Sequence, residues 1–167
     1  MTSPQDDIKE YNELYHSFTE AYINVHSLTR DFYPQAKKFV EGIDPELAVF
    51  AKKLSGEANK ASEPFAYQSL VQYMNHFDDF TLMANKLFSD LKIVLQRSDD
   101  FMTRLLDLKM NLNKIEKGTP EELYIGLIPE LNELLTALKQ IPDRATQLED
   151  RMKHLESDWQ KTKEKIQ

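Results

Sequence analysis

The sequence predicts an all-α protein: an elongated antiparallel three-helix bundle with long kinked helices and a C-terminal coiled-coil arm. Among 167 residues there are only 4 glycines, about a third of the ~7% of average proteins, which disfavours a turn-rich β-sandwich or a glycine-looped enzyme. Apolar residues recur every three or four positions, the period of an amphipathic helix. No stretch shows the two-residue period of a strand. This length suits a single domain.

Prolines and glycines divide the chain into four predicted helices. Proline is favoured at the first helical position, because its missing N–H would have no partner there, and glycine is favoured just past a helix end. The expected starts are Pro4, Pro45, Pro64 and Pro120, and the expected ends precede Gly42 and Gly118. The predicted helices cover residues 4–41, 45–61, 64–117 and 120–167. Pro34, Pro129 and Pro142 fall inside the pattern and predict kinks or short breaks.

Each long segment carries an apolar stripe. The stripes run from Ile8 to Phe32, from Ala66 to Ile115 with Ser98 as the one polar member, and from Tyr124 to Ile166. A third apolar column accompanies these stripes up to about residue 141, which favours a bundle of three or more helices over a two-stranded coiled coil.

Helix lengths suggest how the segments fold together. At ~1.5 Å per residue, the segment 64–117 is roughly 80 Å long, and the first two segments end to end would match it. We therefore expect a three-helix bundle whose first helix is interrupted near Gly42. The alternative is a four-helix bundle in which 45–61 is a separate short helix. The expected division is a bundle over 1–142 and a C-terminal arm over 143–167 that continues the last helix.

The C-terminal arm has a narrow apolar seam flanked by charges. Its seam is Ala145, Leu148, Met152, Leu155, Trp159, Thr162 and Ile166. Two columns of charges flank the seam. In a parallel pair of such arms, each charge of the first column (Arg144, Arg151 and Asp158) faces the residue five positions later on the partner, which lies in the second column. The resulting pairs are all attractive: Arg144–Glu149, Arg151–Glu156 and Asp158–Lys163. The expected protein-interaction residues are Arg144, Leu148, Glu149, Arg151, Met152, Leu155, Glu156, Asp158, Trp159 and Lys163. Alternatively, the arm completes the chain's own bundle with a solvated outer face.

Composition disfavours several classes of function. A formal charge of −7 argues against nucleic acid and anionic lipid as partners, since both require clustered Lys and Arg. The absence of cysteine removes disulfides, thiolate metal sites and cysteine nucleophiles. No glycine-rich phosphate loop or nucleophile-elbow motif is present, so we expect neither an enzyme nor a cofactor.

Two sets of residues at helical spacing have both a structural and a functional interpretation. Glu13 and His16 have the Glu-x-x-His spacing of di-metal bundles. Such sites need a second pair, which the other three histidines do not form, so no metal site is expected. Tyr11, Tyr15 and Tyr22 share one stripe and line either the rim of the core or a groove for a partner helix.

These observations predict a non-enzymatic helical scaffold or adaptor that acts through helix–helix contact as a subunit of a larger assembly of tethering, trafficking or cytoskeletal type. Its partners would be proteins, in a homo- or hetero-oligomer. The N-terminus lacks the features of a secretory signal, so we expect a cytoplasmic protein. One alternative is a membrane-associated dimer of the BAR type, which is similar in architecture only. The other is a secreted helical effector or toxin component.

Overall fold

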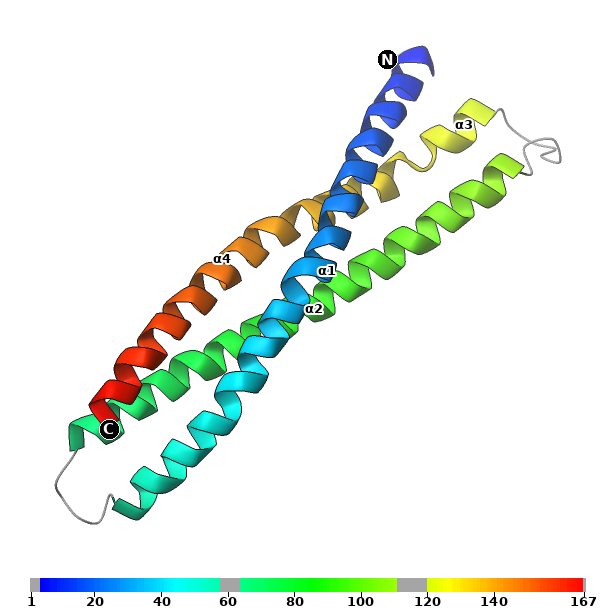
Figure 1. Cartoon of the computed structure of the whole chain (residues 1–167). Helices are drawn as coiled ribbons and strands as arrows, with labels where there is room; N and C mark the ends of the chain where they lie inside the picture. Colours follow the sequence, from blue (N-terminus) through cyan, green and yellow to red (C-terminus); the bar gives the residue numbers. More distant parts are fainter. Residues whose placement is uncertain (1–3, 58–63, 111–119, 167) are drawn as a thin grey trace. The chain divides into compact units, whose positions relative to one another are not determined.

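The computed structural model describes residues 4–57, 64–110 and 120–166 and is all-helical over these ranges. Four helices follow one another along the chain: α1 (Pro4–Glu57), α2 (Pro64–Met110), α3 (Pro120–Ile125) and α4 (Ile128–Ile166) (Figure 1). The prediction of an all-α protein is confirmed for the part of the chain that is described. The predicted ends near residues 61 and 117, with Gly118, lie outside it.

Three of the four predicted helix starts are confirmed, because α1, α2 and α3 begin at Pro4, Pro64 and Pro120. The fourth, at Pro45, is wrong. Helix α1 continues through Gly42 and Pro45 to Glu57, so it has no interruption near Gly42, and residues 45–57 are part of it and not of a separate helix.

Helix α1 can continue through its two internal prolines because the backbone groups that they leave without a hydrogen bond face water. A proline inside a helix deprives the carbonyl four residues earlier of its hydrogen bond. For Pro34 and Pro45 these carbonyls belong to Arg30 and Glu41, and all four residues are exposed. Water can therefore replace the lost bonds. On the opposite side the apolar stripe continues through Phe39, Ile43 and Leu47, all buried, and this packing favours the helix.

The last predicted helix is divided by a short break. Helix α3 ends at Ile125, where the N–H of Gly126 donates to the carbonyl of Glu122 at 3.0 Å. Helix α4 begins at Ile128, so Pro129 occupies its second position, where the missing N–H costs least. The break thus falls where Pro129 predicted a kink or a break. Pro34 and Pro142 lie inside continuous helices, and kinks at these two residues stay predictions.

The contacts divide the chain into two compact units. Unit 1 contains residues 1–28 and 89–143, and unit 2 contains residues 29–88 and 144–167. Helices α1, α2 and α4 each contribute residues to both units, whereas α3 belongs to unit 1 alone. Inside α4 the division falls between Asp143 and Arg144, next to the predicted boundary at 142. In α1 and α2 it falls at positions that no sequence signal marked.

Unit 1 has an aromatic and leucine-rich core. The rings of Phe18 and Phe101 meet edge to face with centroids 5.5 Å apart, and Tyr11 packs on Tyr124 at 5.2 Å. Tyr11 is buried, whereas Tyr15 and Tyr22 are partly exposed, as expected of tyrosines at the rim of a core.

Unit 2 buries a second aromatic group. Phe39 packs on Phe77 and Phe80, with centroids 6.1 and 5.6 Å away. The predicted stripe of α2, which passes through both units, is buried at each of these positions: Leu70, Tyr73, Phe77, Phe80, Ala84, Leu87, Leu91, Val94, Ser98, Phe101 and Leu105.

Candidate functional site: the C-terminal arm

The seam of the C-terminal arm is buried within unit 2 of its own chain. The exposed fractions of Leu148, Met152, Leu155 and Trp159 are 1%, 7%, 6% and 2%. Ala145 and Thr162 are buried as well. The seam belongs to the same unit as parts of α1 and α2, and its Trp159 contacts Glu46 and Phe50 of α1 and Tyr73 of α2. This is the arrangement in which the arm completes the chain's own bundle, and pairing with a second chain stays a prediction.

The charges that flank the seam face outward or find partners in their own chain. Arg151, Glu156 and Asp158 are exposed, and Arg144, Glu149 and Lys163 are partly exposed. Glu149 pairs with Lys153 of the same helix at 3.5 Å. Arg151 Nη1 donates a hydrogen bond to Met83 Sδ at 3.0 Å, and thioether sulfur is a weak acceptor. The arm therefore presents charges of both signs that its own unit uses only in part.

One carboxylate on α1 binds two residues of the arm. Oε2 of Glu46 accepts a hydrogen bond from Trp159 Nε1 at 2.6 Å and lies 3.1 Å from Lys163 Nζ. The Lys163 ammonium also lies 5.5 Å from the centroid of the Trp159 ring, within the range of a cation–π contact. We call Glu46, Trp159 and Lys163 the Glu46 latch.

The two donors stabilise the charged form of Glu46. The hydrogen bond from Trp159 and then that from Lys163 hold the pKa of Glu46 below its ordinary value. The buried indole N–H of Trp159 in turn requires an acceptor. The latch therefore satisfies the indole and joins the arm to α1.

Aromatic rings enclose Trp159 next to the latch. The Tyr73 ring lies 5.0 Å from the indole, and the Phe50 ring meets it edge to face at 5.6 Å. The hydroxyl of Tyr73 donates to the carbonyl of Leu155 at 2.9 Å, a second polar contact between the arm and the rest of unit 2. Burial raises the pKa of Tyr73, and the nearby carboxylates of Asp158, Glu156 and Glu46 raise it further.

The sequence predicted the apolar seam of residues 145–162, which is buried, but not the residues that receive it. Glu46 and Tyr73 lie 113 and 82 positions before their arm partners, beyond the reach of any local spacing. One signal was present. The single tryptophan on an apolar seam must find an acceptor for its N–H, but nothing in the sequence chooses among the chain's many carboxylates.

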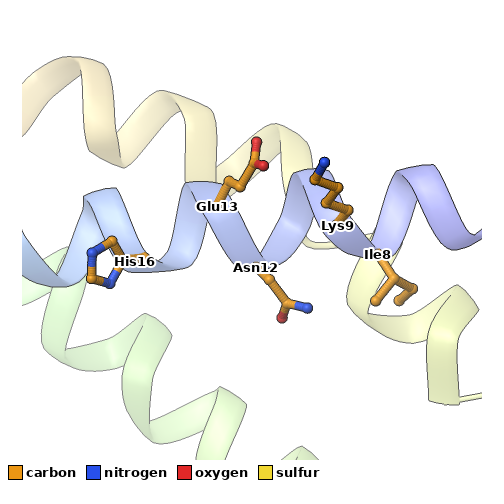
Figure 2. Close-up of a pocket in the computed structure, with 5 residues that line it drawn as sticks. All are labelled: Ile8, Lys9, Asn12, Glu13 and His16. Atoms are coloured by element: carbon orange, nitrogen blue, oxygen red, sulfur yellow. The ribbon is translucent and has the colours of Figure 1, made fainter.

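A hollow along α1 contains Glu13 and His16, the pair with the Glu-x-x-His spacing. Ile8, Lys9, Asn12, Glu13 and His16 line a volume of about 480 Å³. Figure 2 shows Glu13 and Lys9 on one side of α1, with Asn12 and Ile8 on the other. His16 Nε2 lies 3.1 Å from Glu20 Oε1. Within residues 4–57, 64–110 and 120–166, no group of three or more His, Cys, Asp or Glu side chains is placed to hold a metal ion.

A second hollow lies between α1 and α2 in unit 2. Its volume is about 180 Å³, and Ala36 and Ala84 are its buried members, with the edge-to-face pair of Tyr33 and Phe88 at its rim. Lys37 and Glu41, whose charged atoms lie 4.0 Å apart, add a polar edge. It therefore offers a small apolar surface with charged side chains at one edge.

In the described part of the chain, no helix combines the length and apolar character needed to cross a membrane. The chain matches no protein-family model, no curated protein and no solved structure.

Proposed function

We propose that this chain is a non-enzymatic helical scaffold or adaptor, which acts through helix–helix contact as a subunit of a larger assembly. In such a role the long helices present side chains at fixed spacing, and the C-terminal arm is the contact element. The proposed contact residues are the exposed and partly exposed charges of the arm: Arg144, Glu149, Arg151, Glu156, Asp158 and Lys163.

The observation that carries this proposal is the construction of the arm. It is an amphipathic helix whose seam fits a groove between two other helices while its outer columns hold charges of both signs. Helix-in-groove packing is a common mode of protein recognition, and charges at the edge of a seam select the partner and its orientation. A surface built this way suits selective association with another helix.

The burial of the seam decides which experiment is informative. Truncation at residue 142 would remove the arm and also uncover the core of unit 2, so a loss of binding would have two explanations. Substitution of exposed charges avoids this problem. The variant Glu149→Gln/Glu156→Gln/Asp158→Asn removes three negative charges from the arm. The control Glu10→Gln/Glu13→Gln/Asp100→Asn removes three exposed negative charges from unit 1.

The measurements are light scattering of the purified chains and affinity capture with identification of bound proteins. We expect the natural chain and the control to capture the same partner proteins, and the arm variant to lose them. If all three chains capture the same partner proteins, the charged columns of the arm are not the contact surface. If the natural chain neither self-associates nor captures a partner, the scaffold proposal itself is wrong.

A further inference from the structure

The contacts that seat the arm all join it to residues distant in sequence. Besides the buried seam, they comprise the Glu46 latch, the hydrogen bond from Tyr73 to the carbonyl of Leu155, and the contact of Arg151 with Met83. On the receiving side every partner belongs to α1 or α2. A second copy of the chain presents an identical set of partners.

The arm joins the rest of α4 next to a proline. Pro142 lacks the N–H that would bond the carbonyl of Leu138, so the helix has one hydrogen bond fewer at this point. The division between the two units follows at once, between Asp143 and Arg144. The arm thus belongs to a different unit from the preceding part of α4 and follows a turn with one hydrogen bond fewer. Exchange of such an identical element between protomers is a low-cost route to a dimer.

We infer that two copies of this chain associate by arm exchange, in which the arm of each copy occupies the groove between α1 and α2 in unit 2 of the other. This inference builds on the proposed function, and it names the partner as a second copy and the mode of contact as exchange. The exchanged pair contains the same seam packing and the same Glu46 latch as the closed chain, now formed between copies.

Exchange is favoured over a parallel pair of released arms because of what each arrangement leaves uncovered. Two arms that pair only with each other bury their seams, but they leave Phe50, Tyr73 and the rest of the receiving groove in contact with water. Exposure of such apolar surface is unfavourable. Exchange leaves no groove empty and keeps an acceptor for the indole N–H of Trp159.

The absence of cysteine allows a direct test in the full-length chain. One batch carries Arg151→Cys and another Met83→Cys, because these residues are in contact when the arm is seated. The two batches are mixed at rising concentration and treated with a short bis-maleimide. We expect a covalent dimer of one chain of each kind, increasing with concentration. The double variant Met83→Cys/Arg151→Cys, kept dilute, should cross-link within one chain, which verifies that the variants fold and that the pair is within reach.

A matched control and a third batch distinguish the outcomes. Lys153→Cys places the thiol on the exposed side of the arm, and its mixture with Met83→Cys should give little dimer. If the mixed single-cysteine batches give no dimer at any concentration, while the double variant still cross-links within one chain, exchange is overturned. Cross-linking of Arg151→Cys chains to one another, with none to Met83→Cys, overturns exchange in favour of parallel arms. In both cases the scaffold proposal still stands or falls by its own capture experiment, so the two failures are separable.

Discussion

At the scale of single residues, Oε2 of Glu46 holds two residues of the arm at once. Donors that stabilise the carboxylate lower its pKa, so its contribution to stability is present above its ordinary pKa of 4.5 and is lost as the pH falls through the lower value in the folded chain. Glu46→Gln should therefore reduce the free energy of unfolding by about 1 kcal/mol at neutral pH. The difference from the natural chain should shrink as the pH falls below 4.5.

Urea unfolding followed by the fluorescence of Trp159, the single tryptophan, measures this difference. Glu41→Gln is the control, because Glu41 is an exposed carboxylate of the same helix that lies 4.0 Å from Lys37 of that helix. We expect it to change stability by less than about 0.5 kcal/mol at any pH. Equal effects of the two substitutions would contradict the role of the latch.

Ser98 leads to a second prediction at this scale. It is the one polar residue of the α2 stripe, it is fully buried, and its hydroxyl donates to the carbonyl of Val94 at 2.7 Å. In a helix that carbonyl also accepts the N–H of residue 98, so losing the hydroxyl leaves no backbone group unpaired. Ser98→Ala should change stability by less than about 1 kcal/mol. A larger loss in thermal unfolding would show that the hydroxyl has another role.

The sequence determines single residues unevenly. Burial could be predicted almost position by position along α2, because helical periodicity depends on near neighbours. The partners of the buried polar atoms could not, since Glu46 and Trp159 come together only when α1 and α4 pack. The buried seam of the arm was therefore predictable, and the residues that seat it were not.

At the scale of the helix, the sequence and the structure differ at Gly42, where the sequence predicted a helix end and the structure has a continuous helix. As a residue just past a helix end it would adopt a left-handed backbone, where alanine is strained. In the structure it lies inside α1, and a Cβ added there would meet no atom within 4 Å. Gly42→Ala should therefore raise the free energy of unfolding by about 0.5–1 kcal/mol.

The control for Gly42→Ala is the reverse change in the same helix. Ala48 is exposed in α1, and Ala48→Gly should lower stability by about 1 kcal/mol. Circular dichroism during thermal unfolding compares the two. If Gly42→Ala lowers stability, this would contradict a helical Gly42 and support the helix end that the sequence predicted before this residue.

Proline correctly predicted the helix starts at Pro4, Pro64 and Pro120. The start predicted at Pro45 was wrong, because α1 continues through this residue. A proline signal is local, whereas the helix at Pro45 is maintained by Ile43 and Leu47, which are buried in unit 2. Local signals can mark possible helix boundaries in a sequence. Whether a helix continues across such a position depends on packing that forms only in the folded chain.

At the scale of the whole molecule, three helices run from one unit into the other. Because α1, α2 and α4 are each continuous in the structure, loss of packing in one unit should lower the stability of the helices that also build the other. Phe18→Ala removes a fully buried ring from unit 1 and should cost about 3–5 kcal/mol. We expect the unfolding midpoint reported by Trp159, in unit 2, to fall with it.

The comparison is between Trp159 fluorescence and circular dichroism in the same denaturant series. Coincident transitions are expected for the natural chain and for Phe18→Ala, as for a two-state protein. A Trp159 midpoint that does not move while the helical signal falls in two steps would mean that the units unfold independently. The division into units was itself outside sequence reasoning, because it depends on the distribution of contacts between distant segments.

The seating of the arm also determines which tyrosines react. Nitration and iodination proceed fastest on an accessible ring that ionises easily. Tyr73 is 3% exposed, and its hydroxyl is held by the carbonyl of Leu155, whereas Tyr33 is 42% exposed. Mild reagent should therefore modify Tyr33 and spare Tyr73 while the arm is in place. The pattern of modified tyrosines, measured by mass spectrometry on the natural chain, therefore reports whether an arm covers Tyr73.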